Sequence, residues 1–160
     1  MKEIKLNKGF ITLVDDEDYG RLNQWAWRIL KSRHTYYAQR QENVNNKTKS
    51  VLMHREIMNT PKNLQVDHID HDGLNNQKVN MRNCTHLQNL HNQRKKGKYN
   101  KYKGVYVINR DNIIAMITYN YRQIWRKRFF TEREAAIEYD IMARKYFGEF
   151  AELNFPDKLI

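Results

Sequence analysis

Four residues in the middle of the chain, Asp67, His68, Asn80 and Asn89, have the side chains that hydrolysis of a phosphodiester requires. The reaction needs an activated water, neutralised charge in the transition state and a stabilised departing oxygen. His68 can act as the general base, because the unperturbed pKa of an imidazole lies near neutrality. Asp67 and Asn89 offer the hard carboxylate and amide oxygens that Mg²⁺ prefers. The spacing predicts a nuclease site that uses Mg²⁺ or another divalent cation such as Mn²⁺.

Asn80 has a different expected role in this group. An asparagine side chain can bond backbone groups, so Asn80 is expected to close the loop 68–80 and to hold His68 in position. Side chains alternate along a strand, which would point Asp67 and His68 to opposite faces. The chain must therefore turn beside them, or the metal must lie at the edge of the strand.

Arg55 and three further histidines lie near this group in the sequence. Arg55 follows a strand-like run and could contact the scissile phosphate. His71, His86 and His91 keep a zinc site open as a minor alternative, since imidazoles are common zinc ligands. His86 and His91 would lie at different angles of a helix from Asn89, however, and no structural zinc is expected.

The first 60 residues show short strand-like runs around one helical pattern. The runs lie at residues 10–14, 35–38 and 50–54. Apolar residues recur at helical spacing from Tyr19 to Ile29, after acidic residues that favour a helix N-terminus. They predict a helix whose start Asp15 or Asp16 can cap. The pair Trp25 and Trp27 is expected in the core.

Residues 61–93 hold the candidate site between a turn and a helix. The turn is a Gly-containing segment at residues 71–73. Thr85 followed three residues later by Gln88 is typical of a capping box, which predicts a helix that starts at Thr85. This places Asn89 on the second turn of that helix.

The last third of the chain predicts a three-stranded antiparallel sheet covered by one helix. Alternating runs at residues 104–108, 113–119 and 123–129 are joined by polar turns. Thr131 and Glu134 form a second capping box, and Gly148 is placed to end the helix that they open. The apolar stripe of this helix comprises Ala135, Tyr139, Met142, Ala143 and Tyr146. The stripe covers one face of the sheet, and the other face is left for a partner.

The charge balance favours an anionic partner. The chain of 160 residues has 29 Lys and Arg against 18 Asp and Glu, a net charge of +11, and nucleic acid is the commonest partner of such a protein. The segment 94–103 is basic without any acidic residue and is expected to be a linker that follows a phosphate backbone. Its basic residues are Arg94, Lys95, Lys96, Lys98, Lys101 and Lys103. A solvated connector without a partner is the alternative.

Composition excludes several other classes of protein. The single cysteine, Cys84, rules out an internal disulfide and a cysteine-based zinc ribbon, suits a reducing compartment, and is expected to be a small buried apolar residue. No apolar run has membrane-spanning length, and the N-terminus lacks the pattern of a signal peptide. We expect a cytoplasmic protein without a membrane, and the sequence shows no obligate protein partner.

The central residues resemble the HNH family of endonucleases, particularly the phage- and intron-encoded homing enzymes. The resemblance rests on VDHIDHD at residues 66–72, NMRN at residues 80–83 and Asn89. It implies a ββα-metal fold with His68 as general base, Asp67 and Asn89 as metal ligands and Asn80 as organiser of the loop. It also implies a phage or mobile-element origin.

The last third resembles the ERF-type (Apetala-family) DNA-binding domain, known from plant transcription factors and from fusions to HNH nucleases. The match covers YKGVY at residues 102–106, TEREAAIEYD at residues 131–140 and FGEFAELNF at residues 147–155. It implies that the sheet lies in the major groove of double-stranded DNA. The side chains on or near the DNA would then be Lys103, Tyr106, Thr118, Arg126 and Arg128.

The sequence as a whole predicts an α+β protein with a ββα-metal nuclease core and a three-stranded sheet packed on one helix. The expected parts are a strand-rich lead-in packed on the core at 1–60, the HNH motif at 61–93, the basic linker at 94–103 and the ERF-type domain at 104–160. We expect a metal-dependent DNA endonuclease of homing type that nicks or cuts both strands at a recognised site. The alternative is a non-catalytic DNA-binding regulator with a degenerate nuclease core. An RNA-binding module is a weaker reading, because the predicted sheet lacks a clear aromatic pattern.

Overall fold

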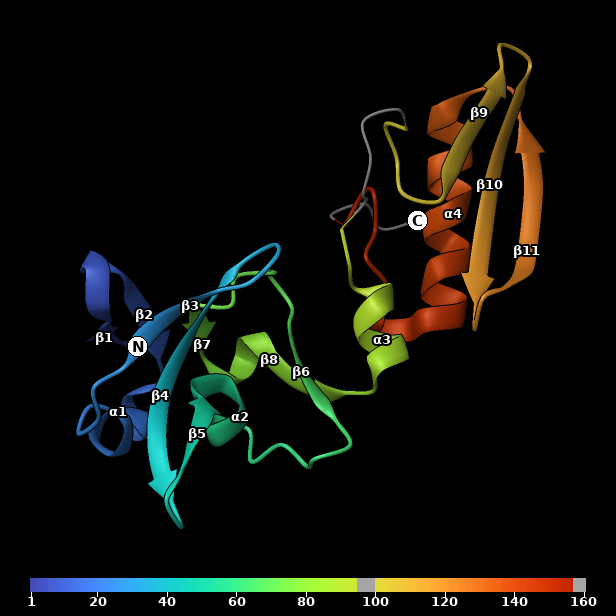
Figure 1. Cartoon of the computed structure of the whole chain (residues 1–160). Coiled ribbons are helices and arrows are strands. Elements are labelled where there is room, and N and C mark those ends of the chain that lie inside the picture. Colours follow the sequence, from blue (N-terminus) through green and yellow to red (C-terminus); the bar gives the residue numbers. More distant parts are fainter. Residues whose placement is uncertain (95–99, 157–160) are drawn as a thin grey trace. The chain divides into compact units, whose positions relative to one another are not determined.

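A computed structural model describes residues 1–94 and 100–156 of the chain, with mixed α and β secondary structure (Figure 1). The chain divides into two compact units, Met1–His86 and Leu87–Ile160. Each unit has its own hydrophobic core. The predicted α+β class is confirmed, whereas the division into four parts stays a prediction. No helix of the described residues is both long and apolar enough to cross a membrane.

The first unit contains three small sheets and two short helices. Its elements are β1 (Lys2–Lys5), β2 (Ile11–Val14), α1 (Asp16–Leu22), β3 (Arg28–Lys31), β4 (Tyr36–Val44), β5 (Lys47–Leu52), α2 (Met53–Ile57), β6 (Gln65–His68), β7 (Asn75–Asn76) and β8 (Met81–Cys84), with 3-10 turns at Asn7–Gly9 and Lys78–Asn80. β2 pairs antiparallel with β1 and parallel with β7. β3, β4 and β5 form an antiparallel sheet, and β6 pairs antiparallel with β8. The parallel pairing of β2 with β7 brings residues that are distant in sequence beside the loop after β6.

Apolar side chains from all three sheets and both helices form the core of the first unit. Its buried members are Ile4, Leu6, Val14, Leu22, Trp27, Ala38, Met53, Ile57 and Met81. Cys84 is buried as expected, and burial raises the pKa of its thiol to about 11. Two polar residues, Thr12 and Asn76, are also fully buried, on the neighbouring strands β2 and β7. Buried polar groups require hydrogen-bond partners, so these two side chains must bond within the protein.

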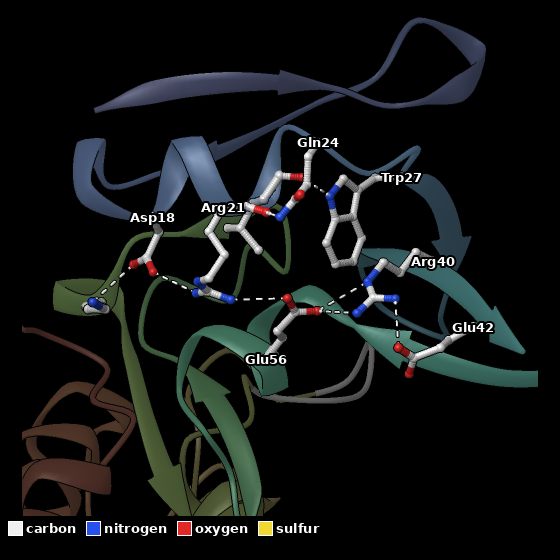
Figure 2. Close-up of polar contacts among 9 residues, drawn as sticks. Asp18, Arg21, Gln24, Trp27, Arg40, Glu42 and Glu56 are labelled. Carbon is white, nitrogen blue, oxygen red and sulfur yellow. Dashed lines mark hydrogen bonds and ion pairs between the residues drawn. The ribbon is translucent and has the colours of Figure 1, made fainter. Parts of the chain in front are cut away.

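The helix expected to reach Ile29 ends at Leu22, and the prediction is wrong beyond that residue. Trp27 is buried because the chain leaves the helix, and its indole N–H donates to the carbonyl of Leu22 over 2.8 Å (Figure 2). This bond satisfies one of the carbonyls that a helix C-terminus leaves without an intrahelical partner. Ile29 pairs with Ala38 in the sheet instead. Only Trp27 of the tryptophan pair is in the core, since Trp25 is 45% exposed.

The strand expected over residues 50–54 also ends early. β5 stops at Leu52, and Met53 and His54 belong to α2. Met53 and Ile57 lie one helical turn apart and are both buried, so the helix packs an apolar face on the core. His54 is buried on the same helix, which carries its imidazole into the interior of the unit.

Ion pairs connect α1, α2 and β4 (Figure 2). Arg21 on α1 donates to Asp18 over 2.7 Å and to Glu56 on α2 over 3.1 Å. The second oxygen of Glu56 accepts from Arg40 on β4, over 3.2 Å to Nη2. The side chains of Arg40 and Glu56 are only 11% and 19% exposed, so solvent screens this contact less than an ordinary surface pair. The network fixes the position of α2, the helix that carries His54.

The second unit is a three-stranded antiparallel sheet with one long helix on it (Figure 1). Its elements are α3 (His86–His91), β9 (Val105–Asn109), β10 (Asn112–Tyr119), β11 (Arg122–Phe129) and α4 (Glu132–Phe147), followed by a 3-10 turn at Gly148–Phe150. The strand order is β11-β10-β9. The buried core between sheet and helix consists of Val105, Ile113, Ala115, Ile117, Ala135, Ala136, Tyr139 and Ala143. The sheet and helix lie where the sequence predicts them.

The ends of α4 show why this prediction holds. The backbone N–H of Glu134 donates to the hydroxyl of Thr131 over 3.2 Å, and that hydroxyl donates to the Glu134 carboxylate over 2.8 Å. Gly148 follows the helix with a φ of 55°, a conformation that favours glycine. The one error in the apolar stripe is Tyr146, which is exposed. Gly104 is needed directly before β9, because its φ is 71° and a Cβ there would lie 2.0 Å from the ring of Tyr139.

Candidate active site

Asp67 and His68 are the last two residues of β6. In the pairing of β6 with β8, Asp67 lies opposite Arg82 and His68 lies opposite Met81. Both side chains are buried, with 4% and 6% of their surface exposed. Each has its own set of partners, as expected for neighbours on a strand.

Arg82 pairs with Asp67 across the two strands. The guanidinium donates to the Oδ2 atom of Asp67 from Nε over 2.9 Å and from Nη2 over 2.7 Å. The side chains are 13% and 5% exposed, and a buried carboxylate needs such an opposite charge. Arg82 belongs to the NMRN segment, but sequence reasoning gave it no role. Pairing strand 65–68 with strand 81–84 across the loop would have placed it opposite Asp67.

His68 bonds to Asn76, and Asn76 bonds to Thr12. The Nε2 atom of His68 lies 3.1 Å from Asn76 Oδ1. The amide nitrogen of Asn76 donates to Thr12 Oγ1 over 2.8 Å. Sequence reasoning missed both residues. Asn76 was one asparagine among many, and Thr12 is far away in sequence.

Two aromatic rings lie against the imidazole of His68. The ring of His54 is edge-on at a centroid distance of 5.3 Å, and the ring of Tyr37 lies at 5.9 Å. Tyr37 and His54 also contact each other at 5.0 Å. Gly73 permits this arrangement, since a Cβ there would lie 2.5 Å from the Tyr37 ring. His54 and Tyr37 are therefore part of the site, whereas sequence reasoning assigned neither of them a role in it.

Burial determines the charge of both imidazoles. Burial is the main reason why the pKa of His54 is lowered to about 3, and the nearby His68 and Arg55 contribute to the same shift. Burial also lowers the pKa of His68, against the opposing effects of Asn76 and of the carboxylates of Asp70, Asp67 and Asp72. Both rings are therefore neutral near pH 7, the state in which an imidazole can accept a proton.

Asn80 makes the predicted contacts across the loop that follows His68. Its Oδ1 accepts from the backbone N–H of Asp70 over 3.0 Å. Its Nδ2 donates to the Asp70 carboxylate and to the carbonyl of Asn75, each over 2.9 Å. The carbonyl of Asn80 accepts from the N–H of Ile69 over 2.9 Å. The chain is thus held in a turn directly after His68.

Arg55 lies on α2, and its guanidinium bonds to backbone carbonyls. It donates to Leu64 over 2.8 Å, to Pro61 over 2.9 Å and to Thr60 over 3.3 Å. Arg55 therefore holds the loop that leads into β6. Its contact with a scissile phosphate stays a prediction.

Asn89 and the other histidines do not all belong to the first unit. Asn89 lies on α3 in the second unit, and its role as a metal ligand stays a prediction. His91 is also in the second unit and stacks on Phe147 at a centroid distance of 3.8 Å. His71 lies in the loop after β6, and Nδ1 of His86 lies 3.5 Å from Gln65. Within residues 1–94 and 100–156, no three His, Cys, Asp or Glu side chains gather as a metal-binding group.

Comparison with known proteins identifies the family. A protein of Acanthamoeba polyphaga mimivirus, named an uncharacterized HNH endonuclease, is 35% identical over 156 residues. The match covers 94% of this chain and 78% of the relative, so it includes parts of both units. The chain belongs to the HNH endonuclease family. No protein-family model matches it, and no solved structure matches it significantly.

The second unit of this HNH family member presents the sheet face that α4 leaves uncovered. Tyr106 and Arg128 flank Ile114 on this face, and Arg126 lies opposite Met116. Thr118 follows on the same side of β10. Tyr106, Thr118, Arg126 and Arg128 are exposed. Arg128 donates to the carbonyl of Asp111 over 2.7 Å.

Lys103 differs from the other residues expected to bind DNA. Its ammonium donates to the carbonyls of His91 and Gln93 over 2.5 Å and 2.8 Å, at the end of α3. Burial lowers its pKa to about 8. Lys103 is thus occupied in holding α3 within the second unit. Of the rest of the basic segment, Arg94 and Lys101 are exposed, whereas Lys95, Lys96 and Lys98 lie outside the described residues.

Proposed function

We propose that this HNH family member is a metal-dependent DNA endonuclease that hydrolyses phosphodiester bonds, as a nicking or double-strand enzyme. The observation that carries the proposal is the buried pair Asp67 and His68 at the end of β6, each side chain held by its own partner. Membership of the family and the name of the mimiviral relative support the reaction class.

His68 is the general base in this proposal. Its burial favours the neutral imidazole, which takes a proton from the attacking water. Asn80 acts as the organiser of the loop behind His68, through its bonds to Asp70 and Asn75. The order of β6, β8 and α3 along the chain is that of a ββα-metal element, and supports this assignment.

Asp67 and Asn89 are the proposed ligands of a divalent cation, Mg²⁺ or Mn²⁺. The chemistry of the two donors fits, because carboxylate and amide oxygens are hard ligands. Arg82 donates two hydrogen bonds to the Oδ2 atom of Asp67 and so holds this carboxylate in one orientation. A bound cation would neutralise charge on the phosphate and stabilise the departing oxygen.

The second unit is the proposed ERF-type DNA-binding part, with double-stranded DNA as its partner. Tyr106, Thr118, Arg126 and Arg128 share the exposed face of its sheet, and this supports contact with a duplex. The net charge of +11 supports affinity for phosphates. Arg94 and Lys101 would add contacts to the DNA backbone, whereas we leave Lys103 out of this set.

A plasmid assay tests the proposed reaction. Supercoiled plasmid that carries the DNA around the protein's own gene is incubated with the full chain and Mg²⁺, Mn²⁺ or EDTA. We expect nicked or linear product with a metal and none with EDTA. His68→Ala should reduce the rate by about 100-fold or more. His34→Ala, a change of an exposed histidine in the same unit, should cut like the unaltered protein.

A non-catalytic regulator is the alternative function, and the same assay separates the two. Absence of metal-dependent product from the unaltered protein, together with retained DNA binding, would favour the regulator. Equal cleavage by His68→Ala would exclude His68 as the base. The burial of Asp67 and His68 among matched partners favours the enzyme, because a degenerate core would not need these polar groups at its centre.

A further inference from the structure

Two polar side chains near His68, Thr12 and Asn76, are fully buried. The proposed function assigns no role to either of them. They come from β2 and β7, which pair in parallel. With His68 and the carbonyl of Leu74 they form an unbroken series of hydrogen bonds. The direction of each bond in this series can be deduced from the chemistry of its groups.

The carbonyl of Leu74 sets the direction, because a carbonyl oxygen can only accept. The hydroxyl of Thr12 lies 2.6 Å from this oxygen, so Thr12 must donate its single proton there. The sulfur of Met53 also lies near that hydroxyl, but at 4.0 Å it is a much weaker acceptor. Leu74 also accepts from the N–H of Leu13 over 2.9 Å, which fixes its oxygen in the pairing of β2 and β7.

The orientation of the Asn76 amide follows from the hydroxyl of Thr12. With its proton given to Leu74, Thr12 Oγ1 can only accept, and the amide group 2.8 Å away must present its NH₂. The reverse orientation would place the Asn76 carbonyl oxygen against the lone pairs of Thr12. Asn76 Oδ1 therefore points to His68, and the Nε2 atom 3.1 Å away must carry a hydrogen.

We propose that Thr12 and Asn76 are positioning residues that fix His68 as the Nε2–H tautomer, so that Nδ1 is the nitrogen that accepts the proton of the attacking water. A neutral imidazole has one protonated nitrogen and one lone pair, and the bond at one nitrogen decides the role of the other. This inference rests on the proposed function, in which His68 is the general base.

The hydrogen bond between His68 Nε2 and Asn76 Oδ1 is also compatible with the positively charged imidazole that forms when His68 accepts a proton. When a water O–H bond breaks, its electrons stay on the oxygen, which forms a bond to phosphorus, and its proton moves to Nδ1 of His68. The bond from phosphorus to the departing oxygen breaks, and its electron pair leaves with that oxygen. The imidazole then carries a positive charge, and Nε2–H still donates to Asn76 Oδ1. The rings of His54 and Tyr37 pack against the imidazole and oppose its rotation. Thr12 and Asn76 thus keep Nε2 of His68 in the same hydrogen bond in both the neutral and the protonated imidazole.

The tautomer can be measured without any metal, DNA or cleavage. Long-range nitrogen–proton correlation spectra of the full-length, metal-free protein distinguish the Nε2–H from the Nδ1–H imidazole. We expect His68 to be in the Nε2–H form. Thr12→Ser keeps the hydroxyl and should leave this form unchanged. Thr12→Val removes the acceptor of the Asn76 amide, which can then turn, and should give a mixture of tautomers.

A matched control and a cleavage assay complete the test. Thr48→Val removes another threonine hydroxyl that bonds to an asparagine, Asn43, on the exposed hairpin of the same unit. It should change neither the spectrum of His68 nor cleavage. With saturating DNA, Thr12→Val should cut about 10-fold or more slowly, whereas Thr12→Ser should cut at nearly the original rate.

The outcomes separate this inference from the proposed function. An Nδ1–H signal for His68 in the unaltered protein would overturn the inference whatever the activity. So would unchanged tautomer and cleavage in a folded Thr12→Val protein. If Thr12→Val fails to fold, Thr12→Ser and the unaltered protein still decide, because both must show Nε2–H. A correct tautomer in a protein that cuts no DNA would refute the proposed function and leave the assigned tautomer standing.

Discussion

His54 lies edge-on against His68, and its Nδ1 atom has no hydrogen-bond partner among the described residues. Its pKa is lowered to about 3 by burial and by electrostatic repulsion from His68 and Arg55. Below pH 6.5 an unfolded chain protonates this imidazole while the folded protein does not, so stability falls as the pH drops toward 3. Between pH 7 and pH 4.5 this group should cost about 2.5 kcal/mol in the free energy of unfolding.

Replacement of this imidazole by a ring that cannot titrate tests the effect. His54→Phe keeps the packing against Tyr37 and His68. In urea unfolding, its free energy of unfolding should fall by about 2.5 kcal/mol less between pH 7 and pH 4.5 than that of the unaltered protein. The contribution of His68, whose pKa is also lowered, stays in both proteins. His34→Phe, at an exposed position, should retain the full dependence. Identical pH profiles for His54→Phe and the unaltered protein would show that folding does not lower the pKa of His54.

At the residue scale, the sequence predicted the groups whose chemistry or spacing is distinctive. Asp67 and His68 are adjacent, and Asn80 closes one loop behind them, so local pattern sufficed. Arg82 depended on a strand register, which the loop length alone does not determine. Thr12 became part of the site only through the parallel pairing of β2 with β7, and no pattern in the sequence predicts a pairing between such distant segments.

At the scale of elements, the end of α3 depends on one lysine in the second unit. The ammonium of Lys103 bonds to the carbonyls of His91 and Gln93. Lys103→Met removes these bonds, and we expect faster amide hydrogen exchange in residues 87–93 and a loss of about 1–2 kcal/mol in the stability of the second unit. The salt dependence of DNA binding should not change, because this ammonium is occupied within the protein.

Arg126→Met is the matched change on the exposed sheet face. It should lower DNA affinity and reduce the slope of log K against log salt by about 1, with no change in the hydrogen exchange of α3. If Lys103→Met instead reduces the salt slope and leaves exchange unaltered, Lys103 binds phosphate, and the original prediction from the resemblance was correct.

Elements were predicted well where their signals are local. The ends of α4 depend on Thr131, Glu134 and Gly148, which lie within or directly beside the helix. The end of α1 depends on Trp27, whose burial and bond to Leu22 arise from packing against distant strands. Helical periodicity continued past Leu22 in the sequence because Trp27 and Ile29 are apolar for a different reason, their place in the core of the first unit.

At the scale of the whole molecule, the proposed general base His68 and the proposed ligand Asp67 lie in the first unit, whereas the proposed ligand Asn89 and the proposed DNA-binding sheet lie in the second. The match to the mimiviral relative includes parts of both. If the units divide the work in this way, cleavage and binding should fail separately. His68→Ala should cut about 100-fold or more slowly yet bind DNA with nearly unchanged affinity. Arg126→Ala should weaken binding yet cut at nearly the original rate once DNA saturates the protein, because the groups around His68 are untouched.

A combined variant makes the prediction quantitative. In equilibrium binding to the same duplex, the affinity of His68→Ala/Arg126→Ala should equal that of Arg126→Ala alone, since sites with no shared partners contribute additively. Single-turnover cleavage at saturating DNA tests whether Arg126→Ala cuts at nearly the original rate once it is bound. A large fall in the saturated rate of Arg126→Ala would mean that the sheet of the second unit also aligns the phosphate for attack. The two units would then act as one site, and affinity alone would not describe what the second unit contributes.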